Sequence, residues 1–199
     1  MDNLLLRRRM MMEETVPSNY VRLEYIESFG YEYINTLFNP DNDTSVEIDV
    51  RSKVGANIRF FASYGSITGL YYGCGFSNSM FFVNQDGAQN TITDKPSDML
   101  RHKVRKEKTK LFVDDVLIND NNEVLFQNPY PLFLFASNDR GTVVILSALV
   151  VYGCKIFDDG VLARNFIPAK RRADDVCGLW DTVTKTFFTN AGTGAFVGG

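Results

Sequence analysis

The 199-residue chain has few of the side chains on which metal, redox and nucleophilic sites are built. It contains one histidine, one tryptophan and three scattered cysteines, Cys74, Cys154 and Cys177, without a CxxC pair. Such a set is typical of buried thiols and not of a disulfide framework or a zinc site. The lone His102 lies in a basic run without a recognisable nucleophile motif, which disfavours a serine or cysteine hydrolase.

Long apolar runs and a strong charge of one sign are also missing. No stretch approaches the ~20 apolar residues that span a bilayer, so we expect no membrane insertion. The N-terminus, MDNLLLRRRMMMEE, opens with an acidic charge and is interrupted by three arginines, unlike a signal peptide. Release from a cell would then depend on lysis or on incorporation into a particle. The net charge of −3, with acids and bases interspersed, argues against a nucleic-acid partner.

Aromatic residues are plentiful, at 13% of the chain, and favour strands over helices. Residues 45–50 alternate with Val46, Ile48 and Val50 on one face. In residues 150–156 the same rule places Val150 and Tyr152 on one side together with Cys154 and Ile156. Residues 132–136 form an unbroken apolar run, typical of a strand that is covered on both sides.

Turn residues separate these segments. Pro168 lacks a ladder donor, so the strand over residues 161–167 should stop there or lie at an edge. Residues 178–188 are typical of a hairpin around residues 182–184. A second hairpin turns at Asp114-Asp115, where the absence of glycine leaves the turn type open. These patterns predict an all-β protein with no long helix.

Four motifs, in order along the chain, resemble the concanavalin A-like (laminin G or pentraxin-like) jelly-roll domains of phage virion proteins and gut-bacterial surface proteins. They are LEYIESFGYEYINT at 23–36, TSVEIDV at 44–50, the hairpin at 101–118, and the segment from CKIFDDG to GLWDTVTKTFFTNAGTGAFVG at 154–198. The resemblance implies a jelly-roll sandwich of two antiparallel sheets over residues 20–199. Residues 1–19 would be an N-terminal docking arm and linker.

Glycosidases of this fold carry two glutamates that flank an aspartate on one strand face. Here Glu47 and Asp49 share a face, but Arg51 stands where a further carboxylate would be. We therefore predict no catalytic residues and interpret the two acids as a solvated face. The basic run at residues 101–110 is likewise interpreted as a solvated strand pair, with an acidic partner surface or a polysaccharide as the alternative.

Exposed rings among the aromatic residues could stack on sugars, and Tyr64, Tyr71 and Tyr72 are the candidate glycan-binding residues. Members of the fold sometimes hold calcium in turns, and several acids lie in predicted turns. They are Asp41, Asp43, Asp139, Asp158 and Asp159. No EF-hand spacing or other fixed ligand pattern appears among them, so we predict no metal and no cofactor.

Residues 4–12 consist of three homogeneous blocks that give no amphipathic stripe on a helix. They are Leu4, Leu5, Leu6, Arg7, Arg8, Arg9, Met10, Met11 and Met12. An arm of this kind gains order from a partner, and the alternative is a disordered leader without a role.

The resemblance and the arm together predict a non-enzymatic virion protein: a head fibre, capsid decoration or tail component that displays a lectin-like sandwich for host attachment. Its partners would be other virion proteins, further copies of itself and a host surface glycan. The alternatives are a stand-alone carbohydrate-binding module with a groove of exposed tyrosines, and a glycoside hydrolase with a suitably spaced acid pair.

Overall fold

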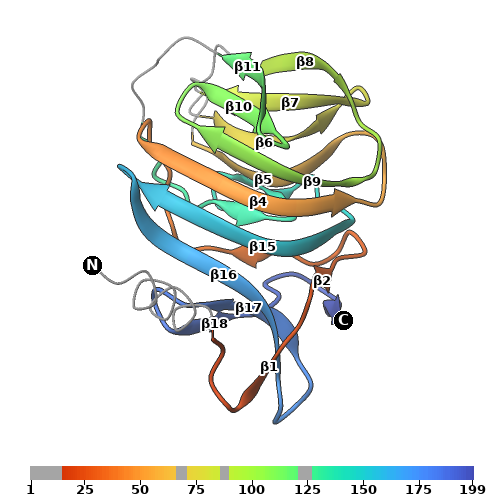
Figure 1. Cartoon of the computed structure of the whole chain (residues 1–199), viewed down its shortest axis with the longest axis vertical. Coiled ribbons are helices and arrows are strands. Elements are labelled where there is room, and N and C mark those ends of the chain that lie inside the picture. The colour runs from red at the N-terminus through yellow and green to blue at the C-terminus, as the bar shows by residue number, and fades with distance from the viewer. Residues whose placement is uncertain (1–14, 66–70, 86–89, 121–126) are drawn as a thin grey trace, which may run out of the picture.

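A computed structural model describes residues 15–65, 71–85, 90–120 and 127–199 (Figure 1). These residues form strands and no helix, and the strands build two sheets that pack face to face. The predicted all-β sandwich is therefore confirmed. No helix capable of crossing a membrane occurs in this described part of the chain.

The larger sheet, here called sheet A, provides the face in front in Figure 1. Its strands are, in spatial order, β11 (Val116–Asp120), β10 (Lys110–Val113), β9 (Arg101–Glu107), β4 (Thr44–Ser52), β15 (Leu149–Asp158), β16 (Val161–Arg171), β17 (Cys177–Asp181) and β18 (Thr186–Phe188). Three short strands flank this path: β1 (Tyr20–Arg22) beside β16, β2 (Ile26–Glu27) beside β15, and β19 (Val197–Gly198) beside β2.

The smaller sheet, sheet B, lies behind sheet A. Its strands are β14 (Thr142–Val144), β13 (Ser137–Asp139), β5 (Ile58–Tyr64), β6 (Tyr71–Ser77), β7 (Met80–Gln85) and β8 (Asn90–Pro96), with β12 (Phe133–Leu134) joining β5 to β3 (Ile34–Asn35). Pairing in both sheets is antiparallel apart from the short parallel contact of β13 with β5. The predicted hairpin at the C-terminal end is confirmed by the pairing of β17 with β18.

The core lies between the sheets and is rich in aromatic rings. Alternation in β4 sends Val46, Ile48 and Val50 into it, as predicted. Sheet B contributes the buried rings of Phe60, Phe61, Tyr72, Phe76 and Phe81. Burying a large apolar side chain contributes roughly 1.5–3 kcal/mol, so this shared interior is the main source of stability.

A β-bulge in β15 overturns the predicted alternation of residues 150–156. Val151 lies opposite Val50, whereas the next paired residue, Gly153, lies opposite Asp49. One extra residue in β15 therefore lets Val151 and Cys154 both face the core. Tyr152 and Gly153 consequently lie together on the outer face, where the alternation had placed Tyr152 inward.

Of the two predicted alternatives for Pro168, the strand does not stop there, since β16 continues to Arg171, but Pro168 does lie at a local edge, with β17 as its one paired neighbour among the described strands. Pairing with β15 stops at Phe166, and pairing with β1 starts at Ala169. The missing N–H of Pro168 thus falls in the gap between two neighbours, and its carbonyl accepts from the Leu23 amide at 2.9 Å. Similarly, residues 132–136 are all buried, but only Phe133–Leu134 form a strand, since Phe135 has a φ of 67°.

Lys106 corrects the interpretation of the basic run as wholly solvated. It lies on the inward face of β9 with His102 and Val104, and it is fully buried. Its ammonium group lies 4.1 Å from the centre of the Tyr72 ring and donates to the Lys108 carbonyl at 2.8 Å. Burial lowers the pKa of Lys106 to about 7. The alternation of β9 therefore places Lys106 in the interior, although lysine side chains are normally solvated.

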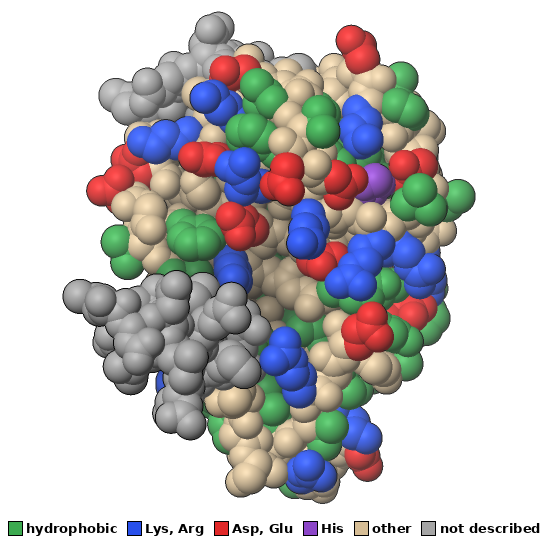
Figure 2. Space-filling model, in the orientation of Figure 1, with side chains coloured by type: hydrophobic (Ala, Val, Ile, Leu, Met, Phe, Trp, Pro, Cys, Tyr) green, Lys and Arg blue, Asp and Glu red, His purple; other side chains and the backbone are tan. Residues whose placement is uncertain are grey.

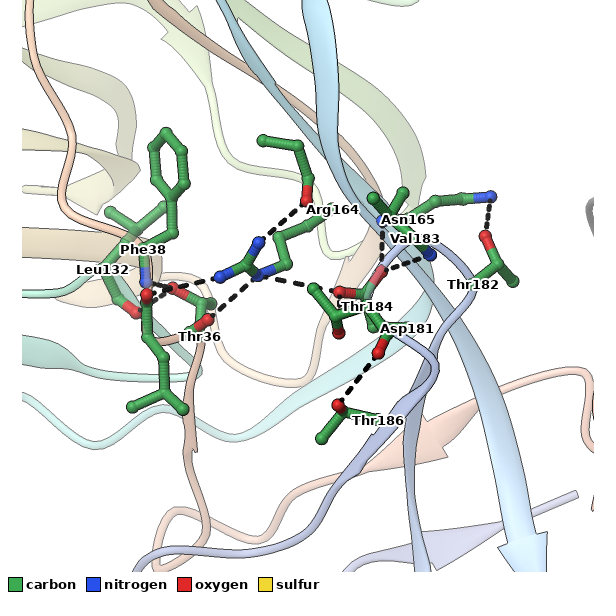
Figure 3. A network of polar contacts seen from close by, with 12 residues as sticks. Thr36, Phe38, Leu132, Arg164, Asn165, Asp181, Thr182, Val183, Thr184 and Thr186 are labelled. Atoms are coloured by element: carbon green, nitrogen blue, oxygen red, sulfur yellow. Dashed lines mark hydrogen bonds and ion pairs between the residues drawn. The ribbon is translucent and has the colours of Figure 1, made fainter.

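The C-terminal hairpin is fixed by the buried carboxylate of Asp181 (Figure 3). Its Oδ1 accepts from the amides of Asn165 and Val183 at 2.9 and 3.0 Å, and its Oδ2 accepts from the Thr184 hydroxyl at 2.7 Å. Arg164 lies 3.6 Å from the same carboxylate and donates to the carbonyl of Thr36. One charge therefore joins β16, the β17–β18 turn and the segment after β3.

Replacing Asp181 by alanine should destabilise the fold strongly. The substitution leaves two amides and one hydroxyl without their acceptor and removes the ion-pair partner of the mostly buried Arg164, and breaking a buried pair costs about 3–5 kcal/mol. Asp181→Asn, which keeps one amide oxygen as acceptor, should lose less. Urea unfolding of both variants measures this, and a loss below about 1 kcal/mol for Asp181→Ala would show that the network is dispensable.

Asp115→Gly should stabilise the protein. Asp114 and Asp115 have φ values of 52° and 63°, so the two-residue turn between β10 and β11 is of type I′, which settles the turn type. Glycine adopts this backbone without the strain that a side chain adds, and we expect a gain of about 0.5–1 kcal/mol. Asp115→Ala is the matched control, because alanine keeps the strain and should be less stable than glycine in thermal unfolding.

Candidate binding groove on the outer face of sheet A

A groove of about 440 Å³ crosses the outer face of sheet A. Its walls come from β9, β4, β15 and β16, with Arg22 added by β1 and Asp115 by the β10–β11 turn. Figure 2 shows this face, where acidic and basic side chains alternate around a central hollow. The volume is within the range of ordinary ligand sites.

The strand order creates a row of polar groups across the groove. Arg105, Glu47, Lys155 and Asn165 lie directly opposite one another on β9, β4, β15 and β16. Neighbouring strands are about 4.8 Å apart, so the row extends over roughly 14 Å. Charges of opposite sign therefore face a ligand in alternation.

A second row of residues, next to the first, contains Gly153, where the groove has no side chain. Lys103 lies opposite Asp49, and Asp49 lies opposite Gly153. A Cβ built on Gly153 would meet only the Phe166 carbonyl oxygen, at an ordinary contact distance of 3.5 Å. The backbone thus does not require glycine here, and the missing side chain leaves the groove open at this point.

Arg101 and Tyr152 form one rim. The Arg101 guanidinium lies 3.6 Å from the centre of the Tyr152 ring. It also donates from Nε and Nη2 to the two carboxylate oxygens of Asp49, at 2.7 and 2.9 Å. The hydrogen bond to Asp49 raises the pKa of Arg101. This bidentate geometry is the strong form of an arginine–carboxylate pair, so Asp49 is already occupied.

Three charged groups of the groove, unlike Asp49, have no ion-pair partner among the described residues. Lys103, Lys155 and Glu47 form no ion pair within 4 Å with any described residue. All three line the groove, where Lys103 and Glu47 are exposed and Lys155 is half-buried. Arg105, by contrast, is paired with Glu107 and lies over the Phe112 ring at 3.8 Å.

The acids of β4 do not form the glycosidase arrangement of carboxyl groups on one strand face. Asp49 has both oxygens bound by Arg101, and the next outward position of β4 is Arg51. Glu47 is therefore the one carboxyl group on the outer face of β4 that is not occupied by a described partner. Glycoside hydrolysis needs two carboxyl groups acting as acid and base or as acid and nucleophile.

His102, next to Lys103, faces inward between two carboxylates. Its Nδ1 lies 2.6 Å from Asp114 and its Nε2 lies 2.8 Å from Asp98. Burial opposes the charged ring, but the two hydrogen bonds outweigh it and raise the pKa of His102. With both nitrogens bonded, the imidazole holds the loop before β9 and the β10–β11 turn together and has no nitrogen free for a substrate.

The predicted glycan-binding tyrosines do not lie in this groove. Tyr72 is fully buried and its hydroxyl donates to the Thr44 carbonyl at 3.0 Å, which removes it from the set. Tyr64 and Tyr71 lie opposite each other in sheet B, half-buried, with rings 4.7 Å apart at right angles. The nine predicted arm residues, 4–12, lie outside the described residues.

The cysteines behave as isolated thiols. All three are free, Cys74 and Cys154 are buried, and Cys177 is half-buried. Burial raises the pKa of Cys74 to about 12 and raises that of Cys154 and Cys177 as well. Thiolates are the reactive form, so none of the three is poised for nucleophilic chemistry. Within the described ranges, no group of three or more His, Cys, Asp or Glu side chains could hold a metal ion.

No model of a known protein family matches this chain, and no curated protein matches it in sequence. Its function is therefore inferred from the groove and from the motifs of the sequence.

The Asp98–His102–Asp114 cluster predicts a pH-dependent contribution to stability. Because the pKa of His102 is raised in the folded state, the contribution is complete below the ordinary value of about 6.5 and is lost as the pH rises through the raised value. Burial opposes the charged form of Asp98 and Asp114, but the hydrogen bonds from His102 and the backbone, together with nearby positive charges, outweigh it and lower the pKa of both carboxyl groups. Their contribution is therefore present above about pH 4 and is lost as the pH falls through the lowered values.

His102 is the single histidine, so its ring proton signal in NMR reports its pKa directly. We expect a value above about 6.5 that falls in Asp114→Asn. Lys106 titrates in the same range with the opposite effect, so stability must be compared between the natural protein and His102→Gln at each pH. The difference in unfolding free energy between the two proteins should shrink as the pH rises from about 5.5 to about 9. A difference that does not change would refute the contribution.

Proposed function

We propose that the protein is a non-enzymatic component of a phage virion, in which the sandwich is displayed and the groove of sheet A binds a glycan of the host surface. The observation that carries the binding role is the open groove, in which Lys103, Lys155 and Glu47 have no ion-pair partner among the described residues. Charges left unpaired in a hollow are available for recognition, whereas isolated surface charges are normally solvated.

The virion role is supported by the resemblance of four motifs to the concanavalin A-like domains of phage virion proteins, and by the two-sheet sandwich. This fold hosts many activities, so the fold alone does not assign one. The pairing of Asp49 with Arg101 supports a non-catalytic role. Glycoside hydrolysis requires two carboxyl groups, and both oxygens of Asp49 already accept hydrogen bonds from Arg101.

The proposed docking element is the segment at residues 4–12. The chain that follows it is fixed on sheet A: Ser18 accepts from Arg172 through its carbonyl at 3.0 Å, and the Tyr20 ring lies 5.1 Å from that of Trp180. The arm thus starts from a rigid point on the sandwich. Docking through it would attach the sandwich to the particle, in a homo-oligomer or together with other virion proteins.

A stand-alone carbohydrate-binding module is the second candidate, and the same groove favours it. The two differ in whether the arm has a partner. A module without a particle role would bind its glycan equally well with or without residues 1–14, and it would be absent from purified virions.

Deleting residues 1–14 should abolish incorporation into particles without unfolding the sandwich. Every strand among the described residues begins at Tyr20 or later, so the thermal unfolding midpoint should stay within a few degrees of that of the full chain. Quantitative immunoblotting of purified particles measures incorporation, and Gly153→Tyr, which alters the groove alone, is the matched control. Incorporation at the full-length level after deletion would refute the docking role.

A further inference from the structure

We infer that the groove of sheet A selects an anionic polysaccharide, whose acidic groups are held by Lys103 and Lys155. This inference rests on the proposed function, since it names the class of glycan that the same groove would bind.

The two lysines lie near Gly153 in different directions, one across the strands and one along β15. Lys103 is on β9, two strands from Gly153, and Lys155 is two residues beyond Gly153 on β15. Strand spacing places the backbone of Lys103 roughly 10 Å from that of Gly153. Neither ammonium group has an ion-pair partner among the described residues. Two separated cations beside the open point at Gly153 suit a ligand that carries repeated anionic groups.

The acid next to Lys103 is neutralised. Asp49 lies directly between Lys103 and Gly153, and both of its oxygens accept from Arg101. Arg101 therefore removes the carboxylate that would otherwise pair with Lys103. The groove is lined by four basic and three acidic residues, whereas the whole chain has a net charge of −3. A locally positive groove on an acidic protein would concentrate anionic ligands.

The remaining polar groups favour a sugar over a polyphosphate. Glu47 lies between Arg105 and Lys155 in the same row, and Asp115 stands at the edge of the groove. A polymer with a phosphate at every unit would bring its charges against these acids. An acidic polysaccharide alternates charged groups with hydroxyls, and hydroxyls can donate to Glu47 while the acidic groups contact the lysines.

The test uses the full chain and four probes of matched length: an oligogalacturonate, a heparin-derived oligosaccharide, a neutral cello-oligosaccharide and an oligo(dT). Trp180, the single tryptophan, lies opposite Ile167 of the groove wall, so its fluorescence is a suitable signal, with calorimetry as a second. We expect one or both acidic saccharides to bind at least tenfold more tightly than the other two probes. Their affinity should fall as salt is raised.

The variants separate charge from shape. Lys103→Gln and Lys155→Gln should each weaken binding of the acidic saccharide about five- to tenfold, and Lys155→Arg should keep most of it. Gly153→Tyr should abolish binding with an unchanged unfolding midpoint, because only ordinary contacts surround the added side chain at its base. Lys110→Gln is the control, since Lys110 is exposed on β10 outside the groove.

Each alternative outcome has a defined meaning. Equal binding of the neutral saccharide would overturn the selection of anionic chains and leave the proposed glycan-binding function intact. Equal binding of oligo(dT) would also overturn the inference, in favour of a general polyanion surface. If no saccharide binds, both the inference and the glycan part of the proposed function fail, while incorporation into particles remains a separate measurement.

Discussion

The pairing of β4 with β15 is the contact on which both faces of sheet A depend. On the inner side it brings Val46 and Ile48 next to Ile156 and Cys154, in the core. On the outer side it sets Glu47 opposite Lys155. A shift of one residue in a strand exchanges its two faces, so a single register defines the apolar interior and the charged groove together. The aromatic rings of sheet B then hold that register, because only one face of β4 can fill the space above them.

The bulge in β15 adds the feature that makes the outer face a groove. With one residue too many between Val151 and Cys154, both can face the core, and Tyr152 and Gly153 are left side by side on the other side. The ring and the missing side chain have opposite effects. Tyr152 builds a rim on which Arg101 lies, and Gly153 leaves the floor open. Bulges commonly redirect side chains in this way next to binding sites.

Charged groups are treated differently inside and outside the sandwich. Asp181 and His102 are buried, and each is surrounded by hydrogen-bonding partners, as the cost of an unpaired buried charge requires. Lys103 is exposed and Lys155 half-buried in the groove, where solvent access removes that requirement. Their lack of ion-pair partners among the described residues is therefore compatible with stability, and it is what gives the groove its proposed affinity for acidic groups.

The sequence alone determined the local features: the alternation of β4, the hairpin between β17 and β18, the turn at Asp114 and the all-β character. Each depends on residues close together in the chain. It also identified Glu47 and Asp49 as outward acids, but it did not contain the register that sets Lys155 opposite Glu47.

Tertiary structure decided the rest. The bulge at Tyr152, the burial of Lys106 and the continuation of β16 through Pro168 all depend on which strand lies alongside, and Lys103 and Lys155 meet across one groove only because β4 lies between their strands. Strand order and register are set by contacts between distant segments, and the period of a single segment does not contain them.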